Sequence, residues 1–186
     1  MYKDWEGIVY PRPKPPRFDP LRYIANFFDA VEINSTFYGP PMAKTATSWV
    51  QRVEEYEKFR FTAKLWKRFT HERDRAWTTG EVDQVRAGFD AMMESGHLGA
   101  VLLQFPWSFR RTEENREWLG DVARTFRHYP LVVEVRHSSW LKSMVTGARV
   151  PAPSGVFDAY GDTMAGYAEP HATRTAQGVP SLTARP

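Results

Sequence analysis

Apolar residues recur along the chain with two alternating spacings, one typical of helices and one typical of strands. Asp19 and Pro20 are typical of a helix start, and apolar residues at helical spacing then predict a helix over residues 20–28. Residues 30–37 form a short, β-branched and alternating segment, which predicts a strand. A second helix is expected around residues 43–55, where the apolar side chains share one face.

The same pattern recurs in the rest of the chain. Residues 59–66 alternate like a strand, residues 81–94 are helical in spacing, and residues 100–105 resemble a buried strand. Thr112 is typical of a helix cap, and residues 131–135 form another apolar strand. Alternating strands and helices require parallel strands joined by right-handed crossovers, either in an open doubly wound sheet or in a (β/α) barrel. No Gly-rich phosphate loop follows a strand, so an α/β fold of the barrel type is favoured.

Polar residues share faces of these strands, because side chains two positions apart on a strand point the same way. This relation pairs Glu32 with Asn34, Thr62 with Lys64, and Glu134 with Arg136, while Gln104 ends the third strand. The opposite faces are apolar and are expected to lie against helices. The polar faces are then expected to point into the barrel near its carboxyl end, where such barrels place their sites.

Two carboxylates in this set are candidate catalytic groups. Glu32 and Glu134 form a possible acid and base pair across the barrel mouth. The alternative is a buried ion network in which they balance Lys64 and Arg136. Lys64 is a candidate amine nucleophile or anion clamp, and Arg136 a candidate holder of a carboxylate or phosphate. Anion binding is the favoured role for both cations.

Histidines in loops extend this candidate site. His71 and His137 with Glu32 or Glu134 resemble a set of metal ligands, but the close His spacing of strong metal motifs is lacking. The prediction is therefore no metal and no cofactor. The expected ligand-binding residues are Asn34, Lys64, His71, Gln104, Arg136 and His137.

Aromatic residues are also frequent near the predicted mouth. A ring beside charged groups is typical of sugar or nucleobase recognition, because the apolar face stacks while polar groups orient the ligand. For Trp66 and Trp107, packing of loops over the barrel rim is the favoured interpretation.

Composition narrows the class of protein. The 186 residues are 42% hydrophobic and include no cysteine, which excludes disulfides and thiolate sites and fits a reducing compartment. The formal charge of +3 comes from scattered residues rather than a basic stripe. Without an apolar span or a signal-peptide pattern at its start, the chain is predicted to be cytoplasmic, with no membrane partner.

Several ordered motifs carry a family resemblance. They are YKDWEG with a following YP, VEINSTFYGPP, FRFTAKLWKRFTH, LLQFPWSFR and VVEVRHSSW. Over roughly residues 2–140 the chain resembles domain-of-unknown-function family 72, the YecE-like family. The resemblance implies a TIM-barrel-like fold without assigning a reaction, and in such proteins an additional strand precedes the first motif.

The segment after Trp140 differs from the rest. Residues 141–186 are rich in Ala, Gly, Pro, Thr and Ser and show no periodicity, so they are predicted to form a disordered tail. A reading-frame shift is the favoured origin, and a natural flexible tail is the alternative. The predicted organisation is an incomplete TIM-like (β/α) barrel of about four parallel strands over residues 1–140, followed by this irregular tail.

Two functional hypotheses follow. The first is an enzyme that acts on a small anionic or polyhydroxylated metabolite at the carboxyl ends of the strands, with this copy expected to be inactive. The second is a non-catalytic binding module, with single-stranded nucleic acid as a candidate partner. The enzyme needs acids and bases in one pocket, whereas the binder needs a basic, aromatic groove.

Overall fold

A computed structural model describes residues 5–140 of the chain. The four strands are β1 (Ala30–Ile33), β2 (Arg60–Lys64), β3 (Leu98–Gln104) and β4 (Leu131–Glu134). They occupy the order β1-β2-β3-β4 in an open sheet, which confirms the prediction of an α/β fold with about four strands. The predicted tail lies outside the described residues.

The described residues divide into two compact units, one up to Gln104 and one from Phe105 onward. In the first unit, β1 pairs with β2 and β2 with β3, all in parallel, as predicted. The helices of this unit are α1 (Pro20–Ala25), η2 (Ser35–Phe37), α2 (Ala43–Val53), α3 (Lys67–Thr70) and α4 (Thr79–Glu94). The second unit contains α5 (Glu113–Thr125) and β4.

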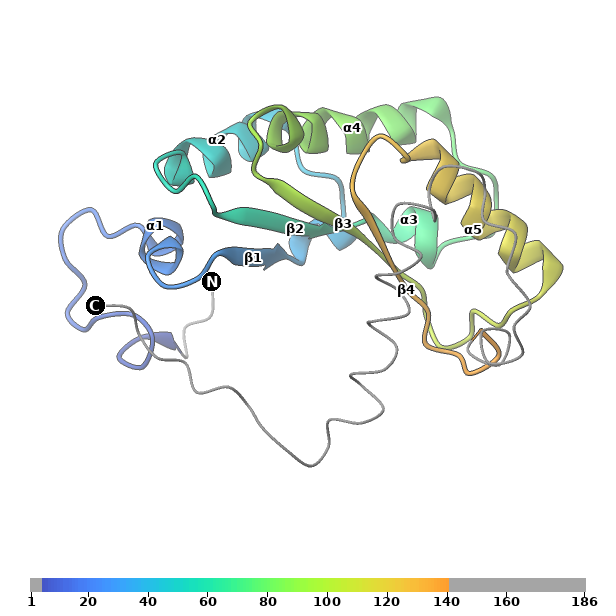
Figure 1. Ribbon diagram of the computed structural model, residues 1–186, viewed down its shortest axis with the longest axis horizontal. Coiled ribbons are helices and arrows are strands. Elements are labelled where there is room, and N and C mark those ends of the chain that lie inside the picture. The colour runs from blue at the N-terminus through green and yellow to red at the C-terminus, as the bar shows by residue number, and fades with distance from the viewer. Residues whose placement is uncertain (1–4, 141–186) are drawn as a thin grey trace. The chain divides into compact units, whose positions relative to one another are not determined.

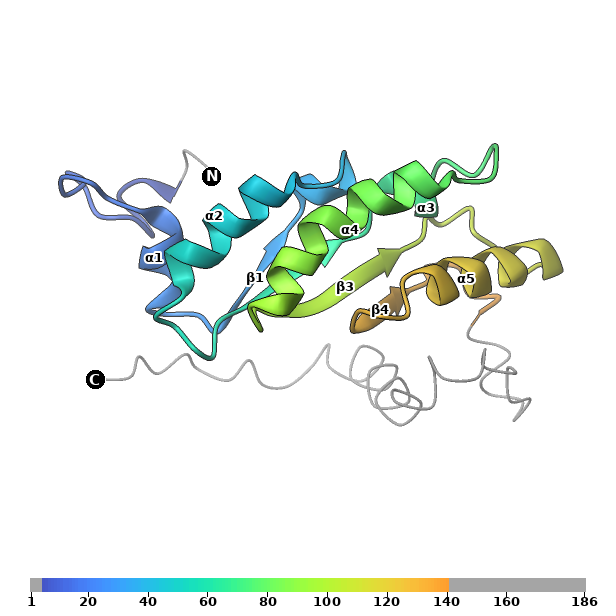
Figure 2. The same ribbon diagram turned by 90° about the horizontal axis from the view of Figure 1, so that it is seen from above.

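Helices cover one face of the strands in the first unit. Figure 1 shows α2 and α4 on the same side of β1, β2 and β3, and Figure 2 shows them from above. The β2 residues Phe61 and Ala63 are fully buried, whereas Thr62 and Lys64 between and after them are partly exposed. The apolar face of β2 therefore lies against the helices, and its polar face points away from them.

The helix starts follow local capping chemistry. The Asp19 carboxylate accepts hydrogen bonds from the backbone N–H groups of Leu21 and Arg22, which fixes the start of α1 as predicted. Thr112 caps α5 by accepting from the Asn115 N–H. For α4, Thr78 and Glu81 form a reciprocal capping box, so this helix begins two residues before its predicted start.

Several element boundaries differ from the prediction, most clearly at α1, β1 and β2. α1 ends at residue 25, because the Asn26 side-chain amide donates to the Arg22 carbonyl and terminates the helix. β1 ends at Ile33, and the predicted strand residues after it turn into η2. β2 ends at Lys64, two residues before the end of the strand predicted over residues 59–66, and the short helix α3 begins at Lys67.

Candidate functional site

Glu32 and Lys64 lie side by side near the carboxyl ends of β1 and β2. Lys64 Nζ is 3.5 Å from Glu32 Oε1, and their side chains are 20% and 41% exposed. In the β1–β2 register Glu32 lies opposite Thr62, which is two residues before Lys64 and on the same face of β2. The helices leave this face uncovered. The sheet therefore brings the Lys64 ammonium and the Glu32 carboxylate together near the carboxyl ends of their strands.

Asn34 does not share this strand face. Its backbone is already helical (φ −80°, ψ −24°), because the chain turns into η2 directly after Ile33. The buried Thr36 hydroxyl lies 2.8 Å from the Ile33 carbonyl oxygen and 2.7 Å from that of Lys64, and so joins the ends of β1 and β2. The prediction that Asn34 extends the face of Glu32 is therefore wrong, because the Thr36 contacts favour a turn.

His71 lies at the end of α3 rather than directly after a strand. Its ring meets the Phe37 ring edge-on, with centroids 4.8 Å apart, and its Nδ1 is 2.9 Å from the Thr70 hydroxyl. The structure thus places His71 beside η2, the element that follows Glu32 and β1. Gln104 is the last residue of β3, as predicted.

The remaining predicted residues belong to the second unit. Arg136 Nε donates to Glu134 Oε1 at 2.7 Å, with the two side chains 51% and 40% exposed. The His137 ring packs against Trp107, with centroids 4.8 Å apart. Trp107 is 62% exposed, so packing over a rim does not bury its ring. That Glu134, Arg136 and His137 converge with Glu32 and Lys64 stays a prediction.

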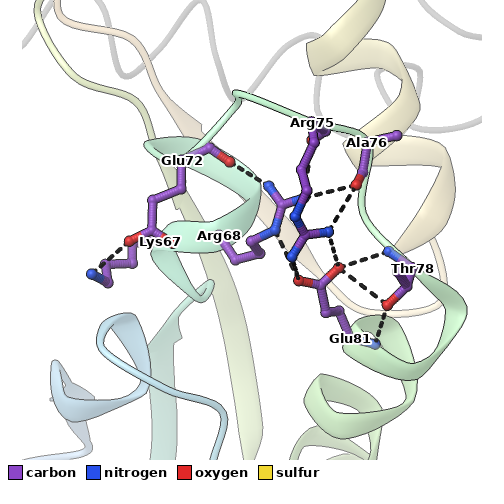
Figure 3. A network of polar contacts seen from close by, with 7 residues as sticks. All are labelled: Lys67, Arg68, Glu72, Arg75, Ala76, Thr78 and Glu81. Carbon is purple, nitrogen blue, oxygen red and sulfur yellow. Dashed lines mark hydrogen bonds and ion pairs between the residues drawn. The ribbon is translucent and has the colours of Figure 1, made fainter.

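A polar network around Arg68 was not predicted from the sequence (Figure 3). Arg68 is 3% exposed; its Nε donates to Glu81 at 2.9 Å, and its terminal nitrogens donate to the carbonyls of Glu72, Arg75 and Ala76. The network holds the segment between α3 and α4 against both helices. In the sequence, the Thr78-x-x-Glu81 capping pattern indicates the contacts between Thr78 and Glu81 but not those of Arg68.

Glu81 is the anionic centre of this network. The Arg75 guanidinium and the Thr78 N–H that donate to its carboxylate, together with Arg68, lower the pKa of Glu81 to about 2. Because the pKa in the folded state lies below its ordinary value of 4.5, the stabilisation is present above that value and is lost as the pH falls toward 2. This carboxylate is therefore a structural anion rather than a proton donor at neutral pH.

The described residues contain neither a cluster of metal ligands nor a membrane-spanning helix. Between residues 5 and 140, no three His, Asp or Glu side chains come together as a set of metal ligands. Within the same range, no helix combines the length and the apolar character needed to cross a bilayer.

The family assignment follows from sequence comparison. Residues 1–150 match the family described as protein of unknown function DUF72, and the chain therefore belongs to this family. The resemblance stated from the motifs is confirmed.

Relatives of known sequence or structure share this fold over about half of their own length. UPF0759 protein YunF of Bacillus subtilis is 30% identical over 142 residues, which cover 71% of this chain and 47% of the relative. A DUF72 family protein of Enterococcus faecalis matches with a TM-score of 0.61 and 26% identity, over 69% of this chain and 52% of that one. A DUF72 family protein of Thermotoga maritima matches with a TM-score of 0.58 and 28% identity, over 75% and 54%. The chain spans about half the length of these relatives.

Proposed function

We propose that the family performs acid-base chemistry on a small anionic or polyhydroxylated metabolite at the carboxyl ends of its strands, and that this chain binds such a ligand without turning it over. In this proposal Lys64 contacts an anionic group of the ligand, and Glu32 beside it is the group that exchanges protons. In the second unit, Glu134 and Arg136 bind hydroxyl groups of a polyhydroxylated ligand. The location is supported by the architecture, since parallel α/β folds bind ligands at the carboxyl ends of their strands.

The geometry of Lys64 is the observation that carries the proposal. Its side chain is only 20% exposed, yet 3.5 Å separates the ammonium nitrogen from Glu32 Oε1. Tight charge-assisted bonds between nitrogen and oxygen are about 2.7–2.9 Å long, so this contact is loose. An ammonium has three donor hydrogens and Glu32 engages it weakly, which leaves it able to bind an anion. Partial burial strengthens that interaction, because the local dielectric is below that of water.

The carboxylates have neighbours that suit proton transfer. Glu32 lies beside Lys64, and Glu134 accepts a hydrogen bond from Arg136. A carboxylate in such a pair can take a proton from a ligand hydroxyl while the adjacent cation stabilises the resulting negative charge. In this proposal Glu32 is the group that performs the step, whereas Glu134 and Arg136 contact hydroxyl groups.

Replacing Lys64 tests the anion contact. We expect Lys64→Met, which keeps the length of the side chain, to weaken binding of inorganic phosphate and ribose 5-phosphate by about tenfold, because a charge-assisted bond is lost. Isothermal titration calorimetry on the full chain measures both affinities. Glu32→Gln removes the competing negative charge and is expected to strengthen phosphate binding.

The control for this experiment is Lys58→Met, an exposed lysine just before β2. It removes the same charge from the molecule at the amino end of β2, whereas Lys64 is the last residue of that strand. Equal losses of phosphate affinity in the two lysine variants would mean that only net charge matters, and the proposed site would be abandoned.

A further inference from the structure

Two loops of the second unit are joined by a buried stack of aromatic rings. Phe105 and Phe109 stack with centroids 4.1 Å apart, and Phe109 and Trp140 stack at 5.3 Å. The Trp140 indole N–H donates to the Phe109 carbonyl at 2.7 Å. All three side chains are buried, so the segment after β3 and the segment after β4 form one fixed platform.

Hydrogen bonds then fix the orientation of His137 on this platform. The Arg111 N–H donates to Ser139 Oγ at 2.8 Å, and the Ser139 N–H donates to His137 Nδ1 at 3.1 Å. Ser139 Oγ is also 2.8 Å from Nδ1, and its hydroxyl hydrogen is available for this contact. Nδ1 therefore accepts, and in the neutral ring the proton resides on Nε2. The contacts at Nδ1 therefore fix the orientation of the His137 ring within the protein itself.

Trp107 rests against this fixed ring and faces solvent. The two ring centroids are 4.8 Å apart at an angle of 47°, while 62% of the Trp107 surface stays exposed. Burying an indole is strongly favourable, so a large ring held open on an ordered support is typical of a binding surface. We call Trp107 and His137 together the ring shelf.

The charged residues that precede His137 along the chain indicate the ligand of the ring shelf. The Arg136 guanidinium donates to Glu134, so the nearest cation on this chain segment is already compensated by a carboxylate. A compensated pair attracts a polyanion weakly, but it offers donors and acceptors to hydroxyl groups. An exposed indole supported by His137, the residue that follows Arg136, suits a ring that is apolar on its face and hydroxylated at its edge.

We propose that the ring shelf binds a pyranose sugar, with the sugar face stacked on Trp107 and its hydroxyl groups bound by Glu134 and Arg136. The inference rests on the proposed function, since polyhydroxylated ligands are one of the two ligand classes named there, and it assigns the class and the residues that recognise it. His137 is a positioning residue that supports the indole.

A titration with a neutral sugar tests the ring shelf separately from the Lys64 contact. In ¹H–¹⁵N spectra of the full chain, methyl β-glucopyranoside should shift the Trp107 indole signal, identified by its loss in Trp107→Phe. Trp107→Ala should weaken sugar binding, followed by the remaining shifted signals, by about tenfold, as stacking losses typically do. His137→Ala should weaken it by a smaller factor of about threefold.

Two control variants separate the possible outcomes. Phe27→Ala removes an aromatic side chain of nearly the same exposure, 63%, from the other unit and should leave sugar binding unchanged. Trp107→Ala should keep the phosphate binding that depends on Lys64, so loss of phosphate binding and loss of sugar binding report on different sites. An unshifted Trp107 signal, or equal losses in Trp107→Ala and Phe27→Ala, would overturn the inference. A decathymidylate that shifts Trp107 at lower concentration than the sugar does would overturn it in favour of nucleic acid.

Discussion

Arg68 illustrates how a buried charge is tolerated when each of its donors has a partner. Its guanidinium is enclosed by the Glu81 carboxylate and by backbone carbonyl oxygens of the segment between α3 and α4. Removing a buried cation leaves those acceptors without their partner, and this lowers the free energy of unfolding strongly. The loss is much larger than the net stabilisation that the ion pair gives over a well-packed apolar pair. The role of Arg68 is therefore to hold a loop rather than to bind a ligand.

We expect Arg68→Ala to lower the free energy of unfolding by about 3 kcal/mol, because it removes one partner of a buried ion pair. Urea denaturation of the full chain followed by circular dichroism measures this change. The control is Arg22→Ala, which breaks the exposed pair of Arg22 with Glu55 in the same unit and should change stability little. Similar, small losses in both variants would show that the Arg68 network is not stabilising.

Individual site residues differ in how far the sequence predicts them. The alternation of β2 predicts that Lys64 leaves the helix-covered face, and its neighbour Glu32 follows from the same rule. Asn34 is misplaced because alternation holds only while the strand continues, and a single buried hydroxyl, Thr36, ends it. Arg68 is missed because its partners lie in loop carbonyls, which leave no trace in the spacing of residues.

At the scale of elements, α4 approaches the chain segment before α2 closely enough to require a glycine. A Cβ built on Gly88 would lie 2.5 Å from Pro41 Cγ and closer still to the Pro41 carbonyl oxygen. Gly80, near the start of the same helix, has open space, with only the Thr78 hydroxyl oxygen at 4.0 Å. Glycine at position 88 is therefore a packing requirement, whereas at position 80 it only lowers helix propensity.

This contrast predicts opposite effects of the same substitution in one helix. Gly88→Ala should destabilise the protein by about 1–3 kcal/mol through overpacking against Pro41. Gly80→Ala should stabilise it by up to about 1 kcal/mol, because alanine is the better helix former. Thermal and urea denaturation of both variants check the signs. Stabilisation by both substitutions would refute the close approach of α4 to Pro41.

Long elements are predicted better than short ones for a physical reason. α4 and α5 have enough turns for apolar periodicity and caps to reinforce each other. α4 begins two residues before its predicted start, and α5 begins at its predicted cap, Thr112. η2 and α3 span three and four residues, too few for any period to show. Their formation depends on tertiary contacts, such as those of Thr36 and Arg68, that local sequence does not report.

At the scale of the whole molecule, the described strands form an open sheet in a family whose compared members are about twice as long. The alternation of strands and helices predicts this α/β architecture, because only parallel strands suit such connections. The pairing of β1 with β2 and of β2 with β3 depends on contacts over long sequence separations, and sequence periodicity does not determine these contacts.

The open sheet leads to a prediction about self-association. Sheet edges without partners and exposed apolar strand residues promote pairing between chains, and Val132 on β4 is 42% exposed. We expect sedimentation velocity to show association of the full chain that increases with protein concentration. Val132→Lys should reduce it, because a charged side chain on an exposed sheet face opposes strand pairing. Met93→Lys, on α4 with 38% exposure, adds the same charge away from the strands and should have little effect. A single monomeric species at every concentration, or equal effects of the two lysines, would show that the sheet is not the surface through which chains associate.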